Sequence, residues 1–96
     1  MVEIVWSRRA LDDRKRIFSY WNERNKSPLF SNKLNFLFKQ TLSLLTKYPH
    51  LGKQTNFEQV RMKFVRNYCL FYKLTNEHLV VLSIWDSYRN PENINL

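Results

Sequence analysis

Two basic side chains stand two residues apart in a stretch of alternating character. Arg61 and Lys63 alternate with the apolar Val60, Met62 and Phe64. A period of two predicts a β-strand, in which residues two apart project from the same face. The two cations therefore share a face, where they could contact nucleic acid or an acidic protein, or simply form the solvated side of an amphipathic strand.

The other side chains that could do chemistry are isolated in the sequence. Cys69 is the only cysteine, which excludes an internal disulfide and a cysteine-rich zinc site, and we expect it to fill space in a sheet. His50 and His78 lack the spacing of metal ligands, so we expect neither a metal nor any other cofactor. Glu58 is the best-placed carboxylate for a general base.

The composition predicts one folded, basic domain over residues 1–96. Hydrophobic residues make up 44% of the chain and aromatic residues 16%, which is too apolar for a disordered protein. The net charge is +8, and no Asp or Glu occurs between Arg24 and Phe57. Such a balance suits nucleic acid, a ribosome or an acidic protein partner.

The sequence predicts a cytoplasmic protein. The apolar start at residues 1–6 is too short for a signal peptide, and no run approaches the roughly 20 residues of a membrane span. A single cysteine fits a reducing compartment. We expect neither a membrane nor a small-molecule substrate among its partners.

The first half of the chain predicts a strand followed by a helical hairpin. Residues 2–6 form the strand, and Ser7 is placed to cap the first helix. Apolar residues then recur on one helical face, with Asp12, Asp13, Lys15 and Arg16 turned to water. After a break at residues 25–28, Ser27 caps a second helix with Pro28 in its first position, and Pro49 and Gly52 end it.

The second half predicts three antiparallel strands in a meander. They span residues 60–65, 68–74 and 78–86, with turns at residues 66–67 and 75–77. Residues 79–82 are apolar on both faces, as in a strand inside a sheet. The tail, residues 87–96, is polar, and Pro91 blocks regular structure there. The predicted order is β-α-α-β-β-β, an α+β domain with the hairpin packed on a mostly antiparallel sheet.

This order of elements and four stretches of sequence resemble the RelE/ParE superfamily of toxins from type II toxin–antitoxin systems. The matching stretches are Leu-Leu-Thr-Lys-Tyr-Pro-His-Leu-Gly at residues 44–52, Val-Arg-Met-Lys-Phe at 60–64, Asn-Tyr-Cys-Leu-Phe-Tyr at 67–72 and Ile-Trp-Asp-Ser-Tyr-Arg-Asn-Pro at 84–91. No single motif is specific, but the ordered set covers almost the whole chain.

The resemblance implies one of two modes of growth inhibition. RelE-like members enter the ribosomal A site and cut mRNA, whereas ParE-like members share the fold, lack that catalytic set and poison DNA gyrase. Members of both branches are silenced by an antitoxin. We expect an antitoxin segment to lie along the helical hairpin and the sheet and to cover the basic face.

The resemblance also implies which residues would cut RNA. Arg61 and Lys63 match the basic pair of RelE-like toxins if one turn residue is deleted, and Arg89 matches the basic residue beyond the last strand. These three are the predicted catalytic residues, and cations of this kind would stabilise the charge that develops on the phosphate.

Two departures from the RelE pattern bear on this prediction. Cys69 stands where RelE-like catalysts have an arginine that grips the phosphate, and the C-terminal Tyr or His is missing. Tyr88 could lie near the site, and Arg66 or Lys73 could replace the lost charge.

Three functions follow from these residues. The first is a ribosome-dependent mRNA endonuclease, which the basic pair and Arg89 favour. The second is a ParE-like, non-enzymatic inhibitor of gyrase, which the long hairpin and the Tyr-Pro-x-x-Gly helix end at residues 48–52 favour. The third is a binding module without lethal activity, which loss of toxicity on induction would distinguish from the other two.

Overall fold

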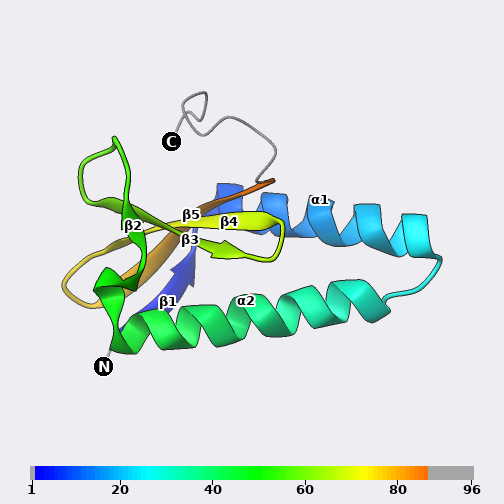
Figure 1. The fold of residues 1–96 in the computed structure, drawn as a ribbon, viewed down its shortest axis with the longest axis horizontal. Coiled ribbons are helices and arrows are strands. Elements are labelled where there is room, and N and C mark those ends of the chain that lie inside the picture. Colours follow the sequence, from blue (N-terminus) through cyan, green and yellow to red (C-terminus); the bar gives the residue numbers. More distant parts are fainter. Residues whose placement is uncertain (1, 87–96) are drawn as a thin grey trace.

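The computed structural model describes residues 2–86, which form a helical hairpin packed on one face of a five-stranded sheet (Figure 1). The elements are β1 (Glu3–Trp6), α1 (Arg8–Asn25), α2 (Leu29–Lys47), the 3-10 turn η1 (Pro49–Leu51), β2 (Lys53–Gln54), β3 (Val60–Val65), β4 (Tyr68–Leu74) and β5 (His78–Asp86). The predicted α+β class and order of elements are confirmed, and the structure adds η1 and the short β2. Neither of the helices in this part of the chain is long and apolar enough to cross a membrane.

The sheet has the order β1-β5-β4-β3-β2. β3, β4 and β5 form the predicted antiparallel meander, and β2 pairs antiparallel with β3. β1 returns to the far side of β5 and pairs with it in parallel, with Ile4 opposite Leu79 and Trp6 opposite Val81. β5 therefore lies between two strands, as its apolar character on both faces predicted.

The helix ends lie close to their predicted positions. Ser7 caps α1, because its Oγ accepts a hydrogen bond from the Ala10 amide at 3.0 Å. At the start of α2 the prediction was wrong by one residue: Pro28 is the N-cap rather than the first helical residue. The Ser27 hydroxyl still accepts a hydrogen bond from the Leu29 amide, at 3.2 Å.

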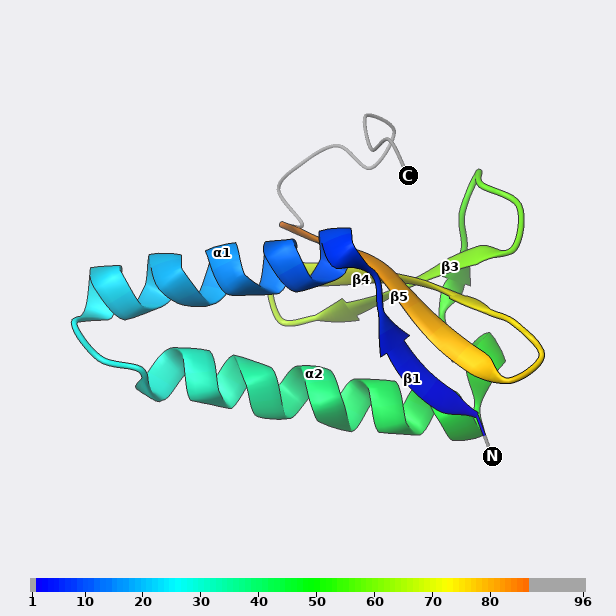
Figure 2. The same cartoon turned by 180° about the vertical axis from the view of Figure 1, so that it is seen from behind.

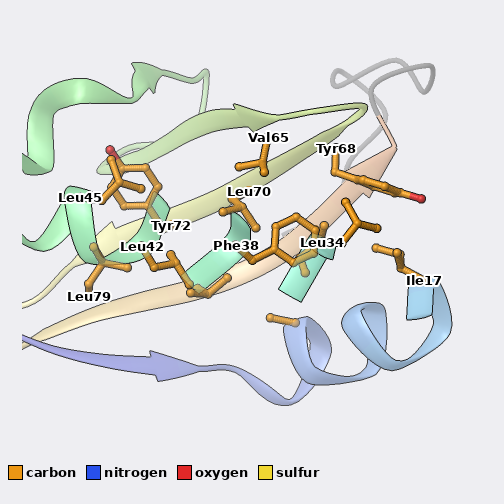
Figure 3. Packing of buried hydrophobic residues seen from close by; sticks show 13 residues of the cluster. Ile17, Leu34, Phe38, Leu42, Leu45, Val65, Tyr68, Leu70, Tyr72 and Leu79 are labelled. Atoms are coloured by element: carbon orange, nitrogen blue, oxygen red, sulfur yellow. The ribbon is translucent and has the colours of Figure 1, made fainter. Parts of the chain in front are cut away.

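The main core lies between the hairpin and the sheet (Figure 3). Phe38 and Leu42 from α2 pack there against Leu70, Tyr72 and Leu79 from the sheet. A second, smaller apolar cluster occupies the opposite face of the sheet. It contains buried Val60, Cys69 and Phe71 with partly buried Met62, Leu82 and Trp85 against them.

One predicted surface residue is buried. Asp13 was expected to face water, but it is only 6% exposed. Its Oδ2 accepts hydrogen bonds from Ser83 Oγ at 2.9 Å and from the Ile84 amide at 3.1 Å, and its Oδ1 pairs with Arg16 at 3.0 Å. The reason is the extent of the strand pairing, since β1 pairs with β5 only as far as Val81. Beyond that point the Asp13 carboxylate of α1 accepts the hydrogen bond of a β5 backbone amide, that of Ile84.

Candidate functional site

Arg61 and Lys63 share one face of β3, as their spacing predicted, and this is the face that carries Val65 into the main core. Both side chains are half-buried. The Arg61 guanidinium donates a hydrogen bond to the Gly52 carbonyl at 2.7 Å, and the same nitrogen lies 3.5 Å from the His50 carbonyl. Arg61 thus ties β3 to the segment that follows α2.

Tyr72 completes this attachment from β4, where it stands directly opposite Arg61. Its hydroxyl donates to the Pro49 carbonyl at 2.7 Å and accepts from the Gly52 amide at 3.0 Å. Burial raises the pKa of the Tyr72 hydroxyl, so that it stays protonated at neutral pH and able to donate. The Tyr-Pro-x-x-Gly end of α2 is therefore fixed against the sheet by two side chains.

Gly52 is required at this contact because there is no room for a side chain. A methyl group on its Cα would lie 2.7 Å from Tyr72 Cε1 and 2.8 Å from the Met62 carbonyl oxygen. The sequence offered the Gly as the end of a helix, but its close approach to Tyr72 depends on the pairing of β3 with β4 and was not predictable from spacing.

A pocket of about 530 Å³ lies beside this attachment, between the β2–β3 loop and the ends of β3 and β4. His50, Glu58, Arg61 and Lys73 line it together with Phe57. Glu58, the carboxylate singled out from the sequence, thus lines the same pocket as Arg61. The two cations and one carboxylate make a mixed rather than a purely anion-binding surface.

Cys69 faces the other side of the sheet. It stands opposite Phe64 in the β3–β4 register, so its side chain projects away from the face of Arg61 and Lys63. It is 4% exposed, and burial raises the pKa of its thiol to about 11. The thiol is therefore neutral at physiological pH and fills the smaller core cluster, which agrees with the prediction for this residue.

The two residues that could replace the lost charge lie at opposite ends of β3 and β4, and of these Lys73 lines the same pocket as Arg61. Arg66 lies in the exposed β3–β4 turn with a φ of 57°, whereas Lys73 pairs with Val60 at the other end of the same two strands. Arg89 and Tyr88 lie outside the described residues. The assignment of Arg61, Lys63 and Arg89 as catalytic residues stays a prediction.

A second pocket, of about 590 Å³, lies between α1 and the adjoining ends of β4 and β5, and sequence reasoning missed it. Trp21 Nε1 donates to the Tyr68 hydroxyl at 2.7 Å, and the Arg24 guanidinium lies 5.9 Å from the Trp21 ring centroid. Arg16 and Asp86 also line the pocket. Trp21 and Arg24 are three apart on α1, a spacing that places them together, but only the fold brings Tyr68 beside them.

Comparisons with known proteins point to one family. The family described as the ParE toxin of the type II toxin–antitoxin system parDE matches residues 4–91. A chain of the chromosomal ParDE toxin–antitoxin system from P. aeruginosa has a similar fold, with a TM-score of 0.76 and 16% identity over 90% of this chain and 96% of that chain.

YafQ from E. coli strain BL21(DE3) has a TM-score of 0.52 and 18% identity over 92% of this chain and 96% of that chain. No curated protein sequence matches the chain. The family match spans nearly all of the described domain, and the solved structures show the same fold. The chain therefore belongs to the ParE toxin family of type II toxin–antitoxin systems.

Proposed function

We propose that this toxin inhibits growth by binding DNA gyrase, as members of the ParE branch do, and not by cutting mRNA. The observation that carries the proposal is Cys69. Where RelE-like catalysts have an arginine for the scissile phosphate, this chain has a buried neutral thiol on the opposite face of the sheet from Arg61 and Lys63. The match to the ParE family also supports inhibition of gyrase. We therefore place gyrase inhibition ahead of mRNA cleavage, the function that the basic pair alone favoured.

The contacts of Arg61 support a structural role for this side chain. Its guanidinium would have to give up the 2.7 Å bond to the Gly52 carbonyl in order to bind a phosphate. A hydrogen bond from a charged group contributes about 1.5–3 kcal/mol, so that exchange has a cost that a solvated arginine would not bear. Arg61 therefore serves the fold by holding the end of α2.

A translation reaction primed with a defined mRNA tests the non-enzymatic part of the proposal. We expect the mRNA to stay intact at the ribosomal A site with purified toxin, and with the Arg61→Lys and Lys63→Met variants. Toxin-dependent cuts that need ribosomes and disappear with the Lys63→Met variant would overturn it and restore Arg61, Lys63 and Arg89 as the catalytic set.

Membership of the family implies an antitoxin partner. We further propose that the antitoxin neutralises the toxin by lying along the helical hairpin and the sheet and covering the face of Arg61 and Lys63, in the cytoplasm, where gyrase acts. The net charge of +8 and the acid-free stretch from Arg24 to Phe57 favour an acidic chain. A complex that leaves Arg61 and Lys63 uncovered would contradict this mode of neutralisation.

A further inference from the structure

The pocket of about 590 Å³ between α1 and the ends of β4 and β5 has aromatic walls. Tyr20 and Trp21 come from α1, and their rings meet edge to face with centroids 5.1 Å apart. Tyr68 comes from β4, and Figure 2 shows α1 running past the turn that precedes this strand. Tyr20 is 53% exposed, so its ring is accessible to a ligand. A cavity of this size with such walls suits a planar ring.

A cation is held beside these rings. The Arg24 guanidinium lies 5.9 Å from the Trp21 ring centroid and donates to the Tyr20 hydroxyl at 3.3 Å. Within residues 2–86 Arg24 forms no ion pair, whereas Arg16, which also lines the pocket, is paired with Asp13 at 3.0 Å. Arg24 is therefore positioned by aromatic side chains and keeps most of its N–H donors for an anion such as a phosphate.

Two polar groups that line the pocket have hydrogen-bonding capacity to spare. The Tyr68 side chain is 8% exposed, and its hydroxyl accepts from Trp21 Nε1 at 2.7 Å but donates to no acceptor within residues 2–86. Burial raises the pKa of this hydroxyl, so it keeps its proton at neutral pH. The Asn67 side chain is exposed in the β3–β4 turn and likewise forms no hydrogen bond in the described part of the chain. A buried donor without an acceptor is explained by a polar ligand.

The charges along the pocket give such a ligand a direction. Asp86 stands opposite Tyr68 in the β4–β5 register and lines the pocket beside it. A phosphate is repelled by this carboxylate and attracted to Arg24, near the end of α1. A heterocyclic base suits the end of the pocket at Tyr68 and Asn67, because its edge carries both donors and acceptors.

We propose that this pocket binds one nucleotide whose base is unpaired, with the base stacked on Tyr20, the phosphate on Arg24, and the base edge toward Tyr68 and Asn67. Aromatic rings and arginine side chains are the groups on which proteins stack unpaired bases. The nucleotide is either free or one residue of a single strand, and both sources share this chemistry. The inference goes beyond the binding of gyrase and does not depend on it, since the pocket shares no residue with the basic pair on β3.

Calorimetric titration of the purified toxin with adenosine and with adenosine 5′-monophosphate tests the site. We expect the monophosphate to bind about tenfold more tightly than adenosine, because only the monophosphate carries the group that Arg24 contacts. Arg24→Gln should remove this difference, and Tyr20→Ala should weaken the binding of both compounds about tenfold. Tyr20 and Arg24 are exposed, so both variants should fold.

The chain offers a matched control for each variant. Arg14→Gln removes the same charge from the same helix, but the Arg14 guanidinium lies 4.4 Å from the Trp6 ring centroid and outside this pocket. Tyr48→Ala removes a tyrosine of similar exposure from the end of α2. Both control variants should bind the two compounds as the parent does.

A third titration, with a single-stranded oligodeoxyadenylate, separates the two sources of the nucleotide. Tighter binding of the strand than of the monophosphate, weakening as salt is added, assigns the pocket to a single strand, and equal affinity assigns it to a free nucleotide. Absence of binding by all three probes would overturn the proposal. Binding that neither Arg24→Gln nor Tyr20→Ala changes, or that the control variants weaken equally, would overturn it as well.

Discussion

At the residue scale, the Asp13 carboxylate joins α1 to the end of β5. Asp13→Ala leaves the Ser83 hydroxyl and the Ile84 amide buried without an acceptor, so we expect it to lower the free energy of unfolding by about 2–4 kcal/mol. The neighbouring Asp12 is the matched control, because its ion pair with Arg8 is exposed and 3.8 Å long. Asp12→Ala should cost less than about 0.5 kcal/mol. Urea unfolding of the two variants compares them, and equal losses would contradict the role given to Asp13.

Tyr72 contributes to the attachment of the α2 end through the two hydrogen bonds of its hydroxyl. Tyr72→Phe keeps the ring in the core but leaves the Gly52 amide without its acceptor and the Pro49 carbonyl without its donor, and we expect a loss of about 1–3 kcal/mol. Tyr48→Phe serves as the control, since Tyr48 is exposed and should tolerate the change. Thermal unfolding measures both. A Tyr72→Phe variant as stable as the parent would show that the hydroxyl does not hold this segment.

Because the Cys69 thiol is buried, we expect it to react slowly in the folded protein. Burial raises its pKa from the ordinary 9.0 to about 11, so the stability that the protonated thiol contributes is complete below pH 9 and is lost as the pH rises through about 11. Between pH 8 and 10 we expect a thiol reagent to modify the folded toxin far more slowly than the urea-unfolded chain. Equal modification rates would mean that Cys69 is accessible.

At the scale of elements, Ser7 joins β1, α1 and β5. Its hydroxyl accepts from the Ala10 amide and donates to the Leu82 carbonyl, both at 3.0 Å. Ser7→Ala should therefore cost about 1–2 kcal/mol, more than the loss of a helix cap alone in most peptides. Ser19, exposed on the same helix, is the control, and Ser19→Ala should leave stability almost unchanged. Equilibrium unfolding with the same effect at both positions would contradict this.

The elements themselves were largely predictable from local pattern. The period of two in residues 60–65 and the turn at Arg66 gave β3 and β4 their boundaries, and the Ser7 cap gave the start of α1. The parallel pairing of β1 with β5 and the short β2 were not predictable, because both depend on contacts between distant parts of the chain. The burial of Asp13 was missed for the same reason, since its partners lie 70 and 71 residues away.

At the scale of the whole molecule, the candidate site shows the limits of strand spacing. Spacing correctly placed Arg61 and Lys63 on one face, but the position of that face, beside the fixed end of α2, follows from the sheet order. The register of β4 against β3 places Cys69 opposite Phe64 and therefore on the other face. The spacing of two basic residues on a strand thus predicts that they share a face. Which other side chains lie on that face, and so which chemistry it can support, depends on the pairing with the neighbouring strand.

The most direct test of the gyrase proposal is a plasmid reaction with purified gyrase, ATP and toxin, followed by protein digestion and electrophoresis. We predict linear plasmid that appears with toxin and disappears when the antitoxin is added, and equal amounts of it with the Lys63→Met variant. Normal supercoiling without linear plasmid, from a toxin preparation that still stops cell growth, would contradict the account.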